Sequence, residues 1–244
     1  MKEKKHYEYV SRQESNEYLT RINKILKILV QKLKRIGIKS KFYIIGSAGK
    51  RNLVTRLVIN GQKKPFDVDV NIEILYIPPK YEKLDSLKEL IRTELNKSIK
   101  ELKENFSDGS NSTSAITVPL YNSQKALIFS FDLGIVSRNK NRDLQRLIFK
   151  KDKEIYTWEV VFNSDLEDKF SYIRSESKWD YLRDEYLNIK NKYINDEFHP
   201  SYICYKMAIN NVYNQLSEEN TEYCPYCAQK KYIWETPCPY CNDD

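Results

Sequence analysis

The chain has 244 residues, enough for one large domain or two small ones, and its hydrophobic content of 41%, with nine Phe and 19 Tyr, is sufficient for a buried core. It contains no run of about 18 apolar residues, and the polar stretch from Met1 to His6 does not resemble a signal peptide, so we expect a cytoplasmic protein without a membrane-spanning segment. The formal net charge of +7 is compatible with a polyanionic ligand but does not identify one, because solvated basic faces give the same total.

The first predicted element is an amphipathic helix at residues 14–36. Its apolar residues recur three and four positions apart, which is the spacing of a helix with one buried face. They are Leu19, Ile22, Ile25, Leu26, Leu29, Leu33 and Ile36. The intervening Lys and Arg residues are expected to form a solvated face, a simpler interpretation than a nucleic-acid platform. Gly37 ends this helix, and a short buried strand at residues 41–45 then ends at Gly46.

Residues 66–74 give the clearest strand signal in the chain. Apolar and polar residues alternate strictly along this segment, which is typical of a strand with one buried and one polar face. The apolar face holds Phe66, Val68, Val70, Ile72 and Ile74, and the polar face holds Asp67, Asp69, Asn71 and Glu73. Pro78 and Pro79 end the segment, and residues 84–102 form a second amphipathic helix that is expected to cover the sheet.

The segments that follow are shorter and complete a mixed fold. Two strands are predicted at residues 115–120 and 126–136, a hairpin at 146–149 and 155–162, and three helices at 166–173, 178–193 and 199–216. We therefore predict an α+β protein with a mixed-sheet core at residues 1–164, a helical domain at 165–218 and a small Cys-rich segment at 219–244.

Three Asp residues on two of these strands form a candidate metal site. Asp67 and Asp69 are two positions apart on one strand, so their side chains leave the same face about 6.5 to 7 Å apart at Cα. Asp132 lies in the otherwise apolar strand at 126–136, where an unpaired carboxylate would be costly, and its small neighbour Gly134 leaves room above the site. Two divalent cations would neutralise these acids, activate an attacking hydroxyl and stabilise a leaving pyrophosphate. The pattern thus predicts a Mg²⁺ or Mn²⁺ site.

A Gly-Ser turn adds a second part of such a site. Gly46 and Ser47 follow a buried strand and offer backbone N–H groups and a hydroxyl to a triphosphate. Each motif alone has a simpler explanation, because Gly-Ser turns are common and an Asp-x-Asp pair on an alternating strand is usually its solvated face. The order of the motifs, with Gly-Ser first, Asp-x-Asp on the next strand and a later strand-borne Asp, favours an active site for nucleotide transfer.

In these motifs the sequence resembles the DNA polymerase β-like nucleotidyltransferase superfamily, over roughly the first 140 residues. The segments around the three Asp residues are most similar to the cGAS and oligoadenylate synthase-like enzymes and their bacterial relatives. The resemblance implies a nucleotidyltransferase core in which Gly46 and Ser47 hold the triphosphate. It further implies that Asp67 and Asp69 bind both Mg²⁺ ions, and that Asp132 binds the catalytic ion and helps to activate the acceptor hydroxyl. The linker from Ser47 to Asp67 is longer than in many members, and its start departs from the usual small-residue-plus-Thr stretch.

The C-terminal segment carries two Cys-Pro-Tyr-Cys pairs, Cys224 with Cys227 and Cys238 with Cys241. Ten residues separate the pairs, a spacing that suits one tetrahedral Zn²⁺ with four thiolate ligands and predicts a structural zinc ribbon. The alternative is a redox site, because Cys-Pro-Tyr-Cys also occurs in glutaredoxins, but no thioredoxin-like pattern of strands and helices surrounds either pair. The fifth Cys, Cys204, lies in an apolar helical run and is expected to be buried.

Together the motifs predict a Mg²⁺-dependent nucleotidyltransferase that moves a nucleoside monophosphate from an NTP to an acceptor hydroxyl and releases pyrophosphate. The acceptor stays open: a second nucleotide, giving an oligonucleotide signal, follows from the resemblance, and an RNA 3′ end, a protein hydroxyl or a small molecule are alternatives. Nucleic acid is a candidate acceptor or activator, and the oligomeric state is open. A different class is an adaptor whose zinc ribbon binds nucleic acid or protein on a non-catalytic scaffold. For an adaptor we expect Asp132 to pair with Lys or Arg and not to lie near Asp67 and Asp69.

Overall fold

The computed structural model describes residues 3–49, 52–161, 166–219, 221–223 and 230–232. The chain divides into two compact units, residues 1–162 and residues 163–244. Within these described ranges, the first unit contains two sheets and two long helices, and the second contains three helices and a short strand pair. Each unit has buried apolar residues of its own.

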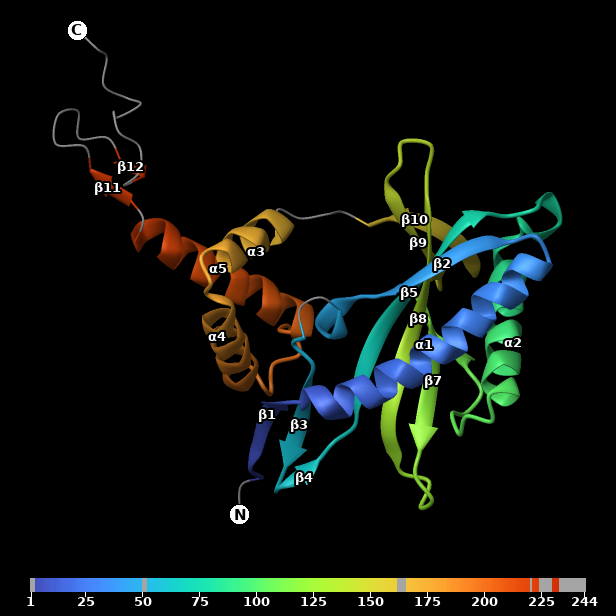
Figure 1. Ribbon diagram of the computed structural model, residues 1–244, viewed down its shortest axis with the longest axis horizontal. Coiled ribbons are helices and arrows are strands. Elements are labelled where there is room, and N and C mark those ends of the chain that lie inside the picture. Colours follow the sequence, from blue (N-terminus) through green and yellow to red (C-terminus); the bar gives the residue numbers. More distant parts are fainter. Residues whose placement is uncertain (1–2, 50–51, 162–165, 220, 224–229, 233–244) are drawn as a thin grey trace, which may run out of the picture. The chain divides into compact units, whose positions relative to one another are not determined.

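A mixed sheet forms the centre of the first unit (Figure 1). Its strands β2 (Lys39–Ile44), β5 (Phe66–Tyr76), β8 (Leu127–Arg138), β9 (Leu144–Lys150) and β10 (Ile155–Val160) lie in the order β10-β9-β8-β5-β2. Strand β7 (Ile116–Tyr121) also pairs with β8, and β6 (Ser110–Asn111) pairs with β7. Strands β5 and β8 run parallel to each other, and the other pairs in this sheet are antiparallel. The predicted α+β class with a mixed sheet is confirmed.

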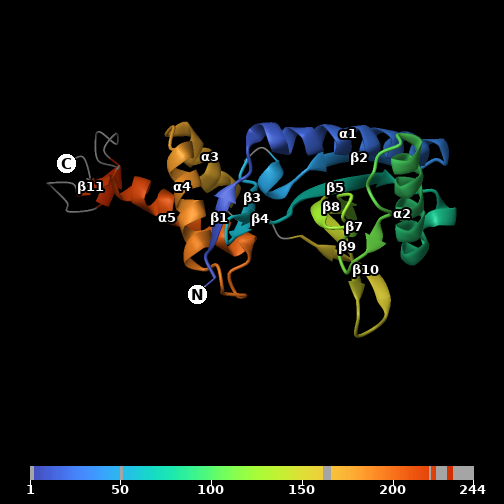
Figure 2. The same ribbon diagram turned by 90° about the horizontal axis from the view of Figure 1, so that it is seen from below.

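Two helices cover the apolar face of this sheet, α1 (Arg12–Arg35) and α2 (Leu84–Glu101). Helix α1 begins where the Ser11 hydroxyl accepts a hydrogen bond from the Glu14 backbone N–H, at 3.1 Å. Figures 1 and 2 both show α1 beside β2. The buried positions of both helices and strands are those with the predicted periodicity. They include Ile22, Ile25, Leu26, Leu29 and Leu33 of α1, Leu87, Ile91, Leu95 and Ile99 of α2, and Phe66, Val68, Val70, Ile72 and Ile74 of β5.

The opposite, polar face of β5 is only partly exposed to solvent. Asn71 and Glu73 are 3% and 2% exposed, whereas the alternation alone suggested a solvated face. The buried Glu73 carboxylate is paired with two exposed cations: its Oε1 lies 3.1 Å from Arg138 Nε, and its Oε2 lies 3.3 Å from Lys41 Nζ. Asn71 Oδ1 accepts a hydrogen bond of 3.0 Å from Arg146 Nη2. A buried carboxylate or amide needs such partners, so this end of the face is an ordered polar network.

A second, smaller sheet was not predicted from the sequence. It consists of β1 (Lys5–Tyr9), β3 (Thr55–Ile59) and β4 (Gln62–Lys63), in the order β1-β3-β4, all antiparallel. Its pattern is obscured because Arg56 occupies an interior position of β3, only 7% exposed. Arg56 forms an ion pair with Glu14 and lies over the Phe66 ring at 4.9 Å, and these contacts offset part of the cost of burying a cation where an apolar residue would be expected.

The second unit contains α3 (Leu166–Ser175), α4 (Trp179–Lys192), α5 (Ser201–Glu219), β11 (Thr221–Tyr223) and β12 (Lys230–Tyr232). Its helices bury Phe170, Ile173, Leu182, Tyr186, Ile209 and Val212, and Cys204 is buried as expected. The four predicted zinc ligands, Cys224, Cys227, Cys238 and Cys241, lie outside the described residues. Among the helices of the described ranges, none has the length and apolar character that crossing a membrane requires.

Candidate active site

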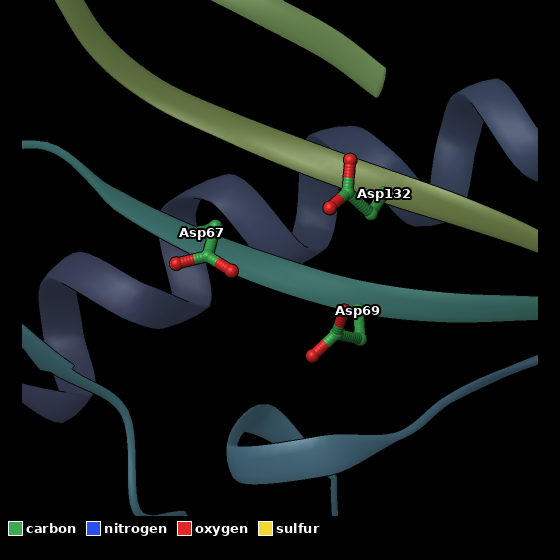
Figure 3. Close-up of side chains that lie close together, drawn as sticks. All are labelled: Asp67, Asp69 and Asp132. Atoms are coloured by element: carbon green, nitrogen blue, oxygen red, sulfur yellow. The ribbon is translucent and has the colours of Figure 1, made fainter. Parts of the chain in front are cut away.

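The three predicted metal-binding carboxylates lie together on the polar face of the central sheet. Asp69 and Asp132 are register partners on the parallel strands β5 and β8, and Asp67 pairs with Ser130 two positions before them. One carboxylate oxygen from each of Asp67, Asp69 and Asp132 lies within 4.8 Å of the others. Figure 3 shows the three side chains on two neighbouring strands. The pleat brings Asp67 and Asp69 to one face, and strand pairing adds Asp132 to the same face.

The electrostatics of this cluster favour the binding of cations. Burial, and then the negative charges of Asp67 and Asp132, raise the pKa of Asp69 to about 6, whereas the Arg146 guanidinium acts in the opposite direction. Asp67 is exposed, and Asp69 and Asp132 are half-buried, so the site is open to solvent on one side. A bound divalent cation would replace the repulsion between the three carboxylates by attraction.

The donor set fits Mg²⁺ or Mn²⁺. Both are hard cations that bind carboxylate oxygens and water, and Mg²⁺ is commonly held by one or two carboxylates together with phosphate oxygens of a substrate. Asp67, Asp69 and Asp132 supply oxygens close enough to share a cation, and the exposed side of Asp67 leaves space for water or phosphate.

The predicted Gly-Ser turn lies directly beside Asp69. Gly46 and Ser47 begin the short 3₁₀ helix η1 (Gly46–Ala48), immediately after β2, and the Ile45 backbone N–H donates to the Asp69 carbonyl at 2.9 Å. Gly46 has φ +61°, and a Cβ at this position would lie 2.8 Å from Asp69 Oδ2. Both the backbone conformation and the lack of space therefore require glycine. The Ser47 carbonyl accepts a hydrogen bond from the Leu53 N–H at 2.7 Å, which fixes the turn from its other side.

Two side chains that contact this region were not predicted from the sequence. Thr117 of β7 donates a hydrogen bond of 2.6 Å from its Oγ1 to Asp132 Oδ1. Arg146 of β9 donates to Asn71, and its charge acts on Asp69. The sequence carries no motif for either residue, because each reaches the site through a strand pairing that periodicity does not reveal.

Gly134 has a role in the packing of this face. We expected it to leave room above the site, and that room is filled by protein side chains. A Cβ at Gly134 would lie 2.8 Å from Asn71 Oδ1 and 3.3 Å from Arg146 Cζ. Because Gly134 has no side chain, the hydrogen-bonded side chains of Asn71 and Arg146 can pack directly against β8.

The surroundings of Asp132 bear on the adaptor alternative. On a non-catalytic scaffold we expected Asp132 to pair with a Lys or Arg. The carboxylate instead lies next to Asp67 and Asp69 and accepts a hydrogen bond from a neutral hydroxyl. This arrangement favours a metal-binding site over a scaffold.

No family model and no curated protein matches the sequence. Solved structures do match. Escherichia coli MS115-1 CdnC with ATP is 13% identical, with a TM-score of 0.51 over 84% of this chain and 62% of CdnC. Vibrio cholerae DncV, a cyclic AMP-GMP synthase in complex with the linear intermediate 5′ pppA(3′,5′)pG, is 11% identical, with a TM-score of 0.56 over 91% of this chain and 78% of DncV. Capnocytophaga granulosa CdnE, a STING-associated c-di-GMP synthase, is 17% identical, with a TM-score of 0.50 over 87% of this chain and 66% of CdnE.

These similarities establish the fold. The chain has the DncV-like nucleotidyltransferase fold, which is the fold that the resemblance of its motifs predicted. The chain spans 62% of the length of CdnC and 78% of the length of DncV.

Proposed function

We propose that this protein is a divalent-cation-dependent nucleotidyltransferase that moves a nucleoside monophosphate from an NTP to an acceptor hydroxyl and releases pyrophosphate. The observation that carries the proposal is the convergence of Asp67, Asp69 and Asp132 beside the Gly46–Ser47 turn. A fold shared with a cyclic AMP-GMP synthase and a c-di-GMP synthase supports the same reaction class. The fold alone does not determine the activity, so the site carries the argument.

We assign a role in cation binding to each carboxylate from its position in the site. Asp67 and Asp69 would hold two cations jointly, and Asp132 would hold the cation on the acceptor side. When bound, such a pair of ions supplies Lewis acidity for the attacking hydroxyl and for the leaving pyrophosphate. The Gly46 and Ser47 backbone N–H groups and the Ser47 hydroxyl would orient the triphosphate beside Asp69.

The reaction balances with the groups of this site. The acceptor oxygen forms a bond to the α-phosphorus, the bond between the α-phosphorus and the bridging oxygen breaks, and pyrophosphate leaves with that electron pair. The acceptor proton passes to solvent water at the open side of the site, while Asp132 would hold the cation on the acceptor side. Asp132 stands on the strand next to Asp69, so the acceptor would approach from the β8 side of the cluster.

We propose a second nucleotide as the acceptor, giving a linear or cyclic oligonucleotide. The DncV structure contains a linear dinucleotide intermediate, and CdnE is described as a c-di-GMP synthase, which supports this choice. An RNA 3′ end, a protein hydroxyl and a small molecule are the competing acceptors. The zinc ribbon at Cys224, Cys227, Cys238 and Cys241 is proposed to be structural.

The test is a screen of purified protein with each labelled NTP, singly and in pairs, with Mg²⁺ or Mn²⁺. Products are separated and identified by mass spectrometry, with and without added DNA or RNA. Wild type is compared with Asp67→Asn and with Asp108→Asn, an exposed Asp that pairs with Lys100 at 3.2 Å. We expect an oligonucleotide product that Asp67→Asn reduces by about 100-fold or more and that Asp108→Asn preserves. A product that forms equally in Asp67→Asn would overturn the assignment.

A further inference from the structure

Thr117 contacts the proposed metal ligand Asp132 in a way that β-sheet geometry defines. Thr117 of β7 and Asp132 of β8 are direct register partners in an antiparallel pair, so their side chains stand side by side on one face. The Thr117 hydroxyl donates to Asp132 Oδ1 at 2.6 Å. This length is that of a charge-assisted hydrogen bond from a hydroxyl to a carboxylate.

The position of Thr117 is fixed by the packing of its own strand. Its neighbours Ile116 and Val118 are fully buried in the core, which directs Thr117 to the opposite, polar face. A one-residue shift of β7 would expose both apolar side chains, so the register is strongly specified.

Helix α2 holds the segment that leads into β7. Lys88, which is 1% exposed, donates from Nζ to the Ser112 carbonyl at 2.7 Å. Arg92 Nη1 donates to the Gly109 carbonyl at 3.2 Å, and the Gly109 N–H donates to Asn96 Oδ1 at 2.8 Å. These three helix residues are spaced four apart and therefore lie in one row along α2. They hold the segment before β7 against the sheet, which helps to fix the position of the Thr117 hydroxyl.

The hydrogen bond limits what Asp132 can do. An Asp carboxylate rotates broadly about its last torsion angle, because that torsion has no sharp staggered minima. The hydrogen bond from Thr117 to Oδ1 restricts this rotation and fixes the Asp132 carboxylate beside Asp67 and Asp69. A ligand held in place before a cation arrives loses less conformational freedom on binding.

We propose that Thr117 is a positioning residue of the active site: its hydroxyl fixes the orientation in which the Asp132 carboxylate would bind a divalent cation. This inference rests on the proposed function, in which Asp132 is a metal ligand. Partners that orient metal ligands in this way typically contribute about 10- to 100-fold in metal affinity or activity.

The direct test is Mn²⁺ binding to the full chain without nucleotide, measured by calorimetry and by the electron paramagnetic resonance signal of free Mn²⁺. Thr117→Val removes the hydroxyl at nearly constant shape, and Thr117→Ser keeps it. Thr157→Val is the matched control, because Thr157 also donates to a carboxylate, Glu159 Oε1 at 3.0 Å, on β10 of the same sheet. We expect Thr117→Val to weaken Mn²⁺ binding about tenfold, and Thr117→Ser and Thr157→Val to stay within about threefold of wild type.

Unfolding midpoints in EDTA verify that each variant is folded, and the increase of the midpoint on adding Mn²⁺ gives a second measure of affinity. The proposal is overturned if Thr117→Val binds Mn²⁺ as tightly as wild type while Asp132→Asn does not. It is also overturned if folded Thr117→Ser loses as much affinity as Thr117→Val, or if wild type binds no Mn²⁺. A chain that shows the expected affinity series but forms no product from any NTP would support the role of Thr117 and refute the transferase.

Discussion

Asp69 and Asp132 are direct partners on the two neighbouring strands that run parallel in the central sheet. Because the polar faces of both strands coincide, this pairing places two carboxylates side by side, with Asp67 two positions before Asp69. When all three carboxylates are ionised they repel one another, and burial further destabilises the ionised form of Asp69. The sheet thus maintains an arrangement that is unfavourable without a cation, which is typical of sites whose geometry is set by function.

Replacing Gly46 by Ala should disrupt the site more than the fold. The new Cβ would lie 2.8 Å from Asp69 Oδ2, and the backbone has φ +61°. Gly61 is a matched control, because it has φ +79° with no atom within 4 Å of the added Cβ. Both substitutions should cost about 1 to 2 kcal/mol of unfolding free energy through backbone strain. We expect only Gly46→Ala to lose Mn²⁺ binding and nucleotide transfer as well, measured by calorimetry and product formation; equal effects of both variants would contradict the contact with Asp69.

Replacing Gly134 by Ala should destabilise the protein by about 1 to 3 kcal/mol, as overpacking does. The added methyl group would lie 2.8 Å from Asn71 Oδ1 and would push the Asn71–Arg146 pair away from β8. Urea unfolding measures the change. A double-mutant cycle with Asn71→Ala is the control, because removing the Asn71 side chain should relieve most of the clash; strictly additive losses would show that the clash is elsewhere.

The stability of the metal-free protein should depend on pH through Asp69. Its pKa is raised to about 6 by burial, Asp67 and Asp132, against Arg146, whereas the unfolded value is about 4. Protonation of Asp69 therefore stabilises the folded state at low pH, and this contribution is lost as pH rises from about 4 through 6. In EDTA, Asp69→Asn should be more stable than wild type at pH 8, with a smaller difference at pH 5.

Thermal unfolding across pH 5 to 8 gives this difference. Asp108→Asn, which changes an exposed carboxylate away from the cluster, should show no such trend. Adding Mn²⁺ at pH 8 should stabilise wild type and not Asp69→Asn. A difference between wild type and Asp69→Asn that stays constant with pH would refute the interpretation.

The Cys-rich segment should hold one Zn²⁺ per chain through Cys224, Cys227, Cys238 and Cys241. Elemental analysis of the purified protein should find about one equivalent of zinc, and Cys227→Ser with Cys241→Ser should remove it. Cys204→Ala is the control, because this buried Cys lies in α5 and should not affect zinc content. Zinc-free protein whose Cys-Pro-Tyr-Cys pairs form disulfides reversibly would instead support the redox alternative.

Periodicity predicted the elements that have one apolar side. Helices α1 and α2 and strand β5 were correctly predicted because their buried residues follow helical or strand spacing without interruption. The chemistry of the carboxylates was also visible, since Asp-x-Asp on a strand and an Asp in an apolar strand are unusual placements. The sequence could not determine that β5 and β8 are neighbours in parallel.

The features that were missed depend on contacts between distant segments. The β1-β3-β4 sheet was hidden by Arg56, whose burial depends on Glu14 and Phe66. Asn71 and Glu73 appeared to belong to a solvated face because their partners come from other strands. Thr117 carries no motif at all, and its role follows from one register pairing with Asp132. Periodicity predicts which face of a single strand is buried, but it does not predict which strands pair and which side chains their pairing brings together.

The central claim is transfer at the α-phosphorus by the three-carboxylate site, and the fate of labelled phosphates tests it most directly. Wild type, Asp132→Asn and Asp108→Asn are incubated with Mn²⁺ and each NTP labelled at either the α- or the γ-phosphate. We predict that wild type and Asp108→Asn place the α-label in an oligonucleotide and the γ-label in pyrophosphate, and that Asp132→Asn does neither. Release of the γ-label as orthophosphate, or α-label transfer that survives in Asp132→Asn, would contradict the account.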